Sequence, residues 1–351
     1  MRKTGRGATQ PNRACCRGVR EAGTTVGGLR KVVAGSALAL MTLALAACIG
    51  RTTDSPAPMD IRSPGTWTVL APMPTARQEV AAAALNGRVF VIGGMTARGE
   101  EVATVEVYDP ATDRWETRAP LPAAMHHPAA AVVNGRLFVA GGFTGRVSST
   151  PLRTVYEYDE ARNSWSTRAA LRTPRGGLAL VALGDSLHAV GGHADRVTGA
   201  HEVYDPATDR WTEAPPMPTA RDHLAAVAFQ GRLWALGGRE SFFGTQFAAV
   251  EIYDPATTSW TAGPPLPTAR GGLGAAVLDD RIFAFGGEAP LRIFSANEMF
   301  EVAGTRWIGK EPMRTPRHGL GVAAVGNRIY AIGGGTEPGL ARTNVNEAYA
   351  P

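Results

Sequence analysis

Five arginines recur at one fixed position in this 351-residue chain, and their side chains could bind an anion. Each lies ten residues after a tryptophan, namely Arg77, Arg175, Arg221, Arg270 and Arg317. Met125 stands at the sixth such position. Guanidinium groups that converge hold carboxylates or phosphates through paired hydrogen bonds, so the pattern predicts a ligand-binding ring. The alternative is structural, with each arginine bonding carbonyls or carboxylates of a neighbouring repeat and fastening the fold.

Acidic residues and histidines lie close to these arginines in the sequence. They are Glu79, His126, His127, Asp222, His223 and His318, together with His193. The imidazoles invite a metal site, but they are spread over several repeats and match no short-spaced ligand motif. We therefore expect no metal and no cofactor. No Ser-His-Asp order and no glycine-rich phosphate loop occurs, so no catalytic residue is assigned.

The elements that must position these side chains come from a repeat. Gly-Gly pairs begin at six points, Gly93, Gly141, Gly191, Gly237, Gly286 and Gly333. A tryptophan lies 26 residues before each pair, at Trp67, Trp115, Trp165, Trp211, Trp260 and Trp307. Such a constant spacing without one insertion indicates a repeated structural unit.

Each unit predicts four antiparallel strands. Between the tryptophan and the Gly-Gly pair, two apolar runs flank a two-residue turn such as Asn86-Gly87, which is the signal of a hairpin. An aromatic residue seven positions before five of the tryptophans, usually followed by Asp-Pro, predicts a second hairpin. The aromatic residues are Tyr108, Tyr158, Tyr204, Tyr253 and Phe300. Their periodicity favours packing between units over a carbohydrate-binding role.

The Gly-Gly pair, the Glu-Val-Tyr-Asp-Pro string and the tryptophan, in this order and period, resemble the kelch repeat. The resemblance covers residues 66–350 and implies an all-β fold, a six-bladed β-propeller with four antiparallel strands per blade. The chain enters with a lone fourth strand at Trp67 and leaves with a third strand ending near Tyr349. We therefore expect the N-terminal strand to complete the last blade and close the ring.

Variation in length is confined to one connection of the repeat. The distance from the first glycine of a pair to the next aromatic residue ranges from 13 to 17 residues, whereas the other intervals are constant. This places variable loops between the second and third strands, on the same face as the links between blades. The arginines lie in those links, so we expect them around the channel mouth on the variable face.

The N-terminal segment has the sequence pattern of an export signal. Arg30 and Lys31 precede an apolar run that ends in Leu45-Ala46-Ala47-Cys48, and this string resembles the lipobox of bacterial lipoproteins. The resemblance implies cleavage before Cys48 and acylation of that residue. The alternative is an uncleaved membrane anchor, for which the apolar run of 16 residues is short. We divide the chain into a leader and signal peptide at 1–47, a lipidated tether at 48–65 and a propeller at 66–351.

Charge and composition limit the function classes. Although the chain has a formal charge of +5, only 28 Lys and Arg against 30 Asp and Glu remain from Cys48 onward, so nucleic-acid binding has no support. We expect a monomeric binding scaffold, exported to the bacterial cell envelope and held at the membrane only by its lipid. Its variable loops would take a protein or an acidic glycan. The alternative is a kelch-type enzyme acting on a sugar acid, such as a sialic-acid mutarotase, with Glu79 beside Arg77 or Asp222 beside Arg221 as the reacting pair.

Overall fold

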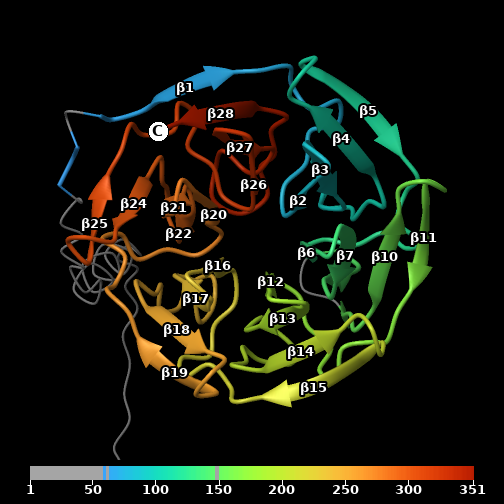
Figure 1. Ribbon diagram of the computed structural model, residues 1–351. Coiled ribbons are helices and arrows are strands. Elements are labelled where there is room, and N and C mark those ends of the chain that lie inside the picture. The colour runs from blue at the N-terminus through green and yellow to red at the C-terminus, as the bar shows by residue number, and fades with distance from the viewer. Residues whose placement is uncertain (1–57, 61–62, 147–149) are drawn as a thin grey trace, which may run out of the picture. The chain divides into compact units, whose positions relative to one another are not determined.

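The computed structural model of the chain describes residues 58–60, 63–146 and 150–351. The described residues from 63 onward form six four-stranded antiparallel sheets arranged as blades around a central axis (Figure 1). Cys48 and the proposed signal peptide lie outside the described residues. No helix that could span a membrane occurs in the part of the chain that the structure describes.

The first three blades follow the chain order. Blade one contains β2 (Ala81–Leu85), β3 (Arg88–Ile92), β4 (Val105–Asp109) and β5 (Arg114–Arg118). Blade two contains β6 (Ala129–Val133), β7 (Arg136–Ala140), β10 (Val155–Asp159) and β11 (Ser164–Thr167). Blade three contains β12 (Ala179–Leu183), β13 (Ser186–Val190), β14 (His201–Asp205) and β15 (Arg210–Ala214).

The other three blades repeat this arrangement. Blade four contains β16 (Ala225–Phe229), β17 (Arg232–Leu236), β18 (Val250–Asp254) and β19 (Ser259–Ala262). Blade five contains β20 (Gly274–Leu278), β21 (Arg281–Phe285), β24 (Asn297–Glu301) and β25 (Arg306–Gly309). Blade six contains β26 (Gly321–Val325), β27 (Arg328–Ile332), β28 (Asn346–Ala350) and, from the other end of the chain, β1 (Thr66–Val69).

The N-terminal strand closes the ring, as the unpaired last repeat predicts. β1 pairs antiparallel with β28, with Trp67 opposite Tyr349. The predicted tether also contacts the propeller at its end, because the backbone of Met59 bridges that of Gly309 and Lys310 Nζ lies 2.7 Å from the Asp60 carboxylate. Ring closure removes the two open sheet edges that an incomplete blade would expose.

The hydrophobic core lies between the blades. Buried side chains form six clusters, and each cluster combines residues of two neighbouring blades. The repeated tryptophans join the blades as well, since each indole Nε1 donates to a backbone carbonyl in the link that leaves the preceding blade. For Trp115 the acceptor is Ala71, and for Trp67, where the ring closes, it is Glu311, both at 2.8 Å. The packing role predicted for the tryptophans is thereby confirmed.

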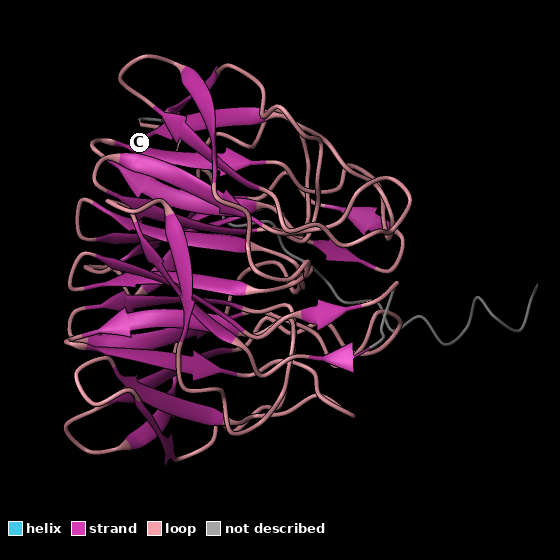
Figure 2. Cartoon of the chain, turned by 90° about the vertical axis from the view of Figure 1, so that its right-hand side faces the viewer, coloured by secondary structure: helices cyan, strands magenta, loops and turns pink. Residues whose placement is uncertain are grey.

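The two faces of the propeller differ as the loop lengths predict. Tight turns join the first to the second strand and the third to the fourth, on one face, whereas longer loops emerge on the other (Figure 2). Two of the long loops form small hairpins of their own, β8 (Phe143–Thr144) with β9 (Thr150–Pro151) and β22 (Glu288–Ala289) with β23 (Arg292–Ile293). The functional residues considered below all lie on this loop face or beneath it.

Candidate functional site

The five recurring arginines are buried inside the blades. All have side chains with no exposed surface, and each forms an ion pair with a glutamate in the third strand of its own blade. The pairs are Arg77–Glu106, Arg175–Glu202, Arg221–Glu251, Arg270–Glu298 and Arg317–Glu347. Carbonyl groups of the same blade complete the arrangement, as where Arg270 Nε donates to Gly286 over 2.6 Å. Each arginine therefore holds its inter-blade link against the blade that this link enters. The structural alternative from the sequence expected contacts with a different blade.

In blade two both members of the ion pair are replaced, each by an uncharged residue. Met125 takes the arginine position, and Tyr156, two residues before Tyr158, takes the glutamate position. Both side chains are buried in one hydrophobic cluster. An apolar pair thus substitutes for a charged pair at the same place in the fold. This coupled exchange supports a fastening role, and the buried arginines are not assigned to ligand binding.

A cavity of about 520 Å³ lies on the propeller axis at the loop face. Its floor comes from the inter-blade links and its walls from the loops between second and third strands. The floor residues include Glu79, His126, His127, Asp222, His223 and His318. The structure therefore brings together the acidic residues and histidines that the sequence placed in separate repeats, and His193 joins them from the wall. None of the five recurring arginines lines this cavity.

A closed ring of backbone hydrogen bonds surrounds the axis. One residue of each link donates its N–H to the carbonyl of its counterpart in the preceding blade, over 2.7 to 3.0 Å. The six residues are Glu79, His127, Gly177, His223, Gly272 and Gly319. All six have positive φ, between 50° and 65°. Glycine adopts this left-handed conformation readily, whereas other residues do so at a cost, so Glu79, His127 and His223 are held in it by the ring.

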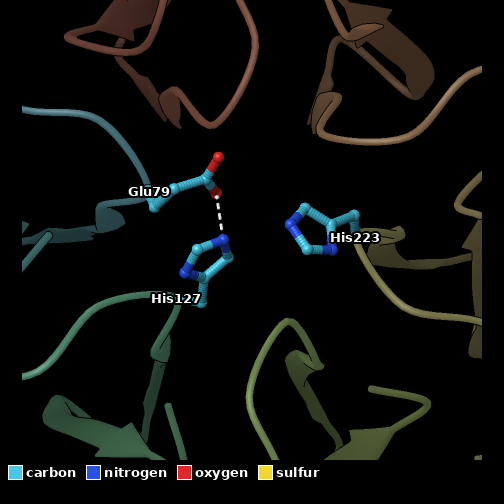
Figure 3. A group of neighbouring side chains, drawn as sticks. All are labelled: Glu79, His127 and His223. Atoms are coloured by element: carbon cyan, nitrogen blue, oxygen red, sulfur yellow. Dashed lines mark ion pairs between the residues drawn. The ribbon is translucent and has the colours of Figure 1, made fainter. Parts of the chain in front are cut away.

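The three side chains converge over the axis (Figure 3). One atom capable of binding metal from each of Glu79, His127 and His223 lies within 4.8 Å of the others. His127 Nε2 is 3.2 Å from Glu79 Oε2, and His318 Nδ1 is 3.3 Å from Glu79 Oε1. On its other edge His127 contacts His126 through the two Nδ1 atoms. A single carboxylate thus lies among imidazoles that come from three blades.

Arg239 and two further carboxylates bound the site on the side of blades four and five. His223 Nδ1 lies 3.0 Å from Asp222 Oδ1, and its Nε2 accepts a hydrogen bond from Arg239 Nη2 over 2.8 Å. Arg239 also pairs with Glu288 at 2.6 Å. A guanidinium only donates, so Nε2 is the acceptor in this contact, and Nδ1 lies on the side of Asp222.

Burial and neighbouring charges set the protonation of the floor. Burial opposes ionisation of Glu79, but His127, His318 and His223 outweigh it and hold the pKa of this carboxyl well below its usual value. Burial lowers the pKa of His127 well below that of free imidazole, against the attraction of the Glu79 carboxylate. Burial also acts against His318, yet Glu79 and Glu288 raise its pKa overall. The floor therefore presents an ionised carboxylate among imidazole side chains.

Comparison with known proteins agrees with this architecture. The KLHDC2/KLHL20/DRC7 Kelch-repeats domain matches residues 60–217, and the Kelch motif matches residues 220–267 and 316–351. The chain is a kelch-repeat protein. The solved structure of YjhT shares the propeller fold with a TM-score of 0.68 and 16% sequence identity, over 79% of this chain and 95% of that one. An F-box/kelch-repeat protein of Arabidopsis thaliana is 46% identical over 46 residues, which is 13% of this kelch chain and 12% of the plant protein.

Sequence reasoning missed two charged residues of this kelch site, Arg239 and Glu288. Both directly follow a Gly-Gly pair, as do Met95, Phe143 and His193, and all five line the cavity. The position after the glycine pair is therefore the signal that would have found them. Aligning the repeats would also have shown that Glu79, His127 and His223 occupy a position that is glycine in the other three blades.

Proposed function

We propose that this kelch propeller binds a small ligand in the axial cavity of its loop face. The observation that carries the proposal is the cavity itself, because a volume of about 520 Å³ is in the usual range for small-molecule sites. Its walls are largely apolar, with Met95, Phe143, Phe242 and Leu340, while convergent polar groups lie on the floor. Leu340 and Ser241 are exposed at the rim, so a ligand has a path from solvent.

Charge on the floor favours a neutral or cationic ligand that donates hydrogen bonds. Glu79, Asp222 and Glu288 supply carboxylates, and the arginine in the cavity lining, Arg239, already pairs with Glu288 and lies 3.6 Å from Asp222. An acidic glycan would meet these carboxylates without a free guanidinium to hold it. The prediction of an acidic ligand, which rested on the five recurring arginines, therefore has less support than a neutral or cationic ligand.

The sugar-acid enzyme alternative needs a carboxylate beside an arginine that holds the substrate. Glu79 and Asp222 do face the cavity, but Arg77 and Arg221 are buried against Glu106 and Glu251 in their own blades. The two pairs that adjacency in sequence suggested are thus separated by the fold. Binding without catalysis is the function that this geometry supports better.

Location at the cell envelope is part of the proposal and rests on the Leu45-Ala46-Ala47-Cys48 string. A lipid on Cys48 would tether the propeller to a membrane through the following residues. In cells fed a labelled fatty acid, Cys48→Ser should abolish incorporation into this protein. Unchanged labelling of the variant would overturn the anchor.

A thermal-shift screen tests ligand binding. Neutral, cationic and anionic metabolites are added to the full chain and to two variants, Ala194→Trp, which fills the cavity, and Ala111→Trp, which places the same side chain on an exposed turn of the opposite face. Compounds that raise the melting temperature of the wild type should act equally on Ala111→Trp and not on Ala194→Trp. Equal shifts in both variants, or hits restricted to anions, would contradict the proposal.

A further inference from the structure

The six residues that form the backbone hydrogen-bond ring at the axis are three glycines and three residues with large polar side chains. All six blades need a left-handed backbone there, and Gly177, Gly272 and Gly319 meet that need without strain. Glu79, His127 and His223 adopt the same conformation with φ of 53°, 53° and 50°. Strained backbone of this kind is typically retained where the side chain has a function. These three side chains all point to one place, over the axis (Figure 3).

The glycines make room for the converging side chains. A Cβ atom on Gly319 would lie 2.5 Å from the Glu79 carboxylate, and one on Gly177 would lie 3.2 Å from the His223 ring. A larger residue at either position would push the neighbouring side chain away from the centre. The three glycines therefore leave the space that the side chains of Glu79, His127 and His223 occupy.

The donor set is that of a transition-metal site. Two imidazoles and one carboxylate bind zinc, iron and related divalent ions, with further positions left for water or a ligand. His127 Nε2 and Glu79 Oε2 are 3.2 Å apart, close to the roughly 3–3.5 Å between adjacent ligand atoms whose bonds to the metal are about 2.0–2.2 Å. His223 lies within 4.8 Å of both and needs to approach by about 1 to 2 Å.

Each of the three has a partner on the side away from the centre. His126 contacts the Nδ1 edge of His127, Asp222 lies 3.0 Å from His223 Nδ1, and His318 lies 3.3 Å from Glu79 Oε1. Partners of this kind fix the ring orientation and tautomer of metal ligands. His223 Nε2 and His127 Nε2 are thereby the nitrogens that face the centre.

We propose that Glu79, His127 and His223 bind one divalent transition-metal ion, with Zn²⁺ as the preferred cation, at the floor of the axial cavity. Arg239 Nη2 gives up its bond to His223 Nε2 when the ion binds and keeps its pair with Glu288. The inference goes beyond the binding of an organic ligand and does not depend on it.

Zinc titration of the full chain tests the proposal. The protein is stripped with EDTA, dialysed and titrated with ZnCl₂ by calorimetry, alongside His127→Gly, His223→Gly and the control His193→Gln. His193 lines the cavity but is not one of the three converging residues. We expect one Zn²⁺ per wild-type chain, a similar affinity in His193→Gln, and an affinity lower by at least about 100-fold in each glycine variant, beyond the 10–100-fold typical of losing an outer partner.

The glycine variants separate metal binding from folding. Glycine is the natural residue at the same position of three other blades, so the metal-free variants should melt no lower than the metal-free wild type. If either unfolds, His127→Asn and His223→Asn provide a second pair, because asparagine tolerates positive φ. Failure of the wild type to bind Zn²⁺, or equal affinity in wild type and folded variants, would overturn the metal site. Cavity ligands found with EDTA present would still support the proposed function.

Discussion

The backbone N–H of His127 donates to the carbonyl of Glu79 over 3.0 Å, while His127 Nε2 lies 3.2 Å from the carboxylate of the same residue. Two neighbouring blades are therefore joined twice at the axis, once by backbone and once by side chain. The first contact belongs to a ring that all six blades share. The second exists because these two blades carry Glu and His where three others carry glycine. One position of the repeat thus supplies both the backbone ring that joins the blades and the side chains of the proposed site.

The arginine–glutamate pairs should behave as fasteners. Arg270→Met should lower the free energy of unfolding by about 3–5 kcal/mol, because it leaves the buried Glu298 without its partner. Arg270→Met combined with Glu298→Tyr copies the apolar pair of blade two and should recover much of that loss. Urea unfolding of the two single variants and the double variant measures the coupling. Additive losses with no recovery would contradict the fastening role.

Ring closure depends on Trp67. Its ring packs against Phe285 and Tyr349 and its Nε1 bonds Glu311, so Trp67→Ala should cost about 3–5 kcal/mol. Val69 lies two residues further along the same strand with its side chain exposed, and Val69→Ala should change stability by less than about 0.5 kcal/mol. Denaturant melts of both variants check this. Equal effects would mean that β1 does not hold the last blade.

Acid should destabilise the fold through a buried histidine pair in blade three. Burial lowers the pKa of His188 to about 4 and that of His201 to about 3. Below about pH 6.5 each histidine of the unfolded chain binds a proton, whereas the same histidine in the folded chain stays unprotonated. The free energy of unfolding therefore decreases as the pH is lowered. The loss from pH 6.5 to pH 5 is about 1.5 kcal/mol per histidine.

The matched control for this effect is His188→Phe with His201→Val, which installs residues found at the same positions of blade two, Phe138 and Val155. Unfolding free energies of the wild type and this double variant are compared from pH 5 to pH 7.5. The wild type should show the steeper dependence. Parallel curves would show that the two histidines do not titrate differently on unfolding.

Crowding at the axis predicts a difference between two glycines. Gly319→Ala and Gly135→Ala both place a side chain at positive φ, but only the first meets another group, the Glu79 carboxylate. Gly319→Ala should therefore destabilise by about 1–3 kcal/mol more than Gly135→Ala, which has open space around it. Adding Glu79→Gly to Gly319→Ala should remove the excess. An excess that persists in the double variant would place the clash elsewhere.

Most of the fold is readable from the sequence because the repeat imposes it. The constant interval from Trp67 to Gly93, repeated in each unit, defines the strands and turns, and the lone strand at Trp67 requires ring closure. The constellation around Glu79 and His223 was also foreseeable, since the inter-blade links converge on the axis in a closed ring.

The direction of side chains within the links was not foreseeable from spacing alone. Arg221 and His223 are two residues apart, yet the first enters its own blade and the second faces the axis. The left-handed backbone at His223 produces this difference. A histidine in the sequence does not by itself indicate a positive φ. The glutamate partners, such as Glu251, and the exchange of Met125 with Tyr156 become visible only when the repeats are aligned.

Anomalous diffraction at the zinc edge tests the central claim most directly, that the functional centre is the axial meeting point of Glu79, His127 and His223. Crystals of the protein grown with ZnCl₂ should show an anomalous peak about 2.0–2.2 Å from a carboxylate oxygen and two imidazole nitrogens of these residues. Crystals of His223→Gly should lack it. A wild-type map with no peak at the axis, or with zinc only on surface residues, would contradict the claim.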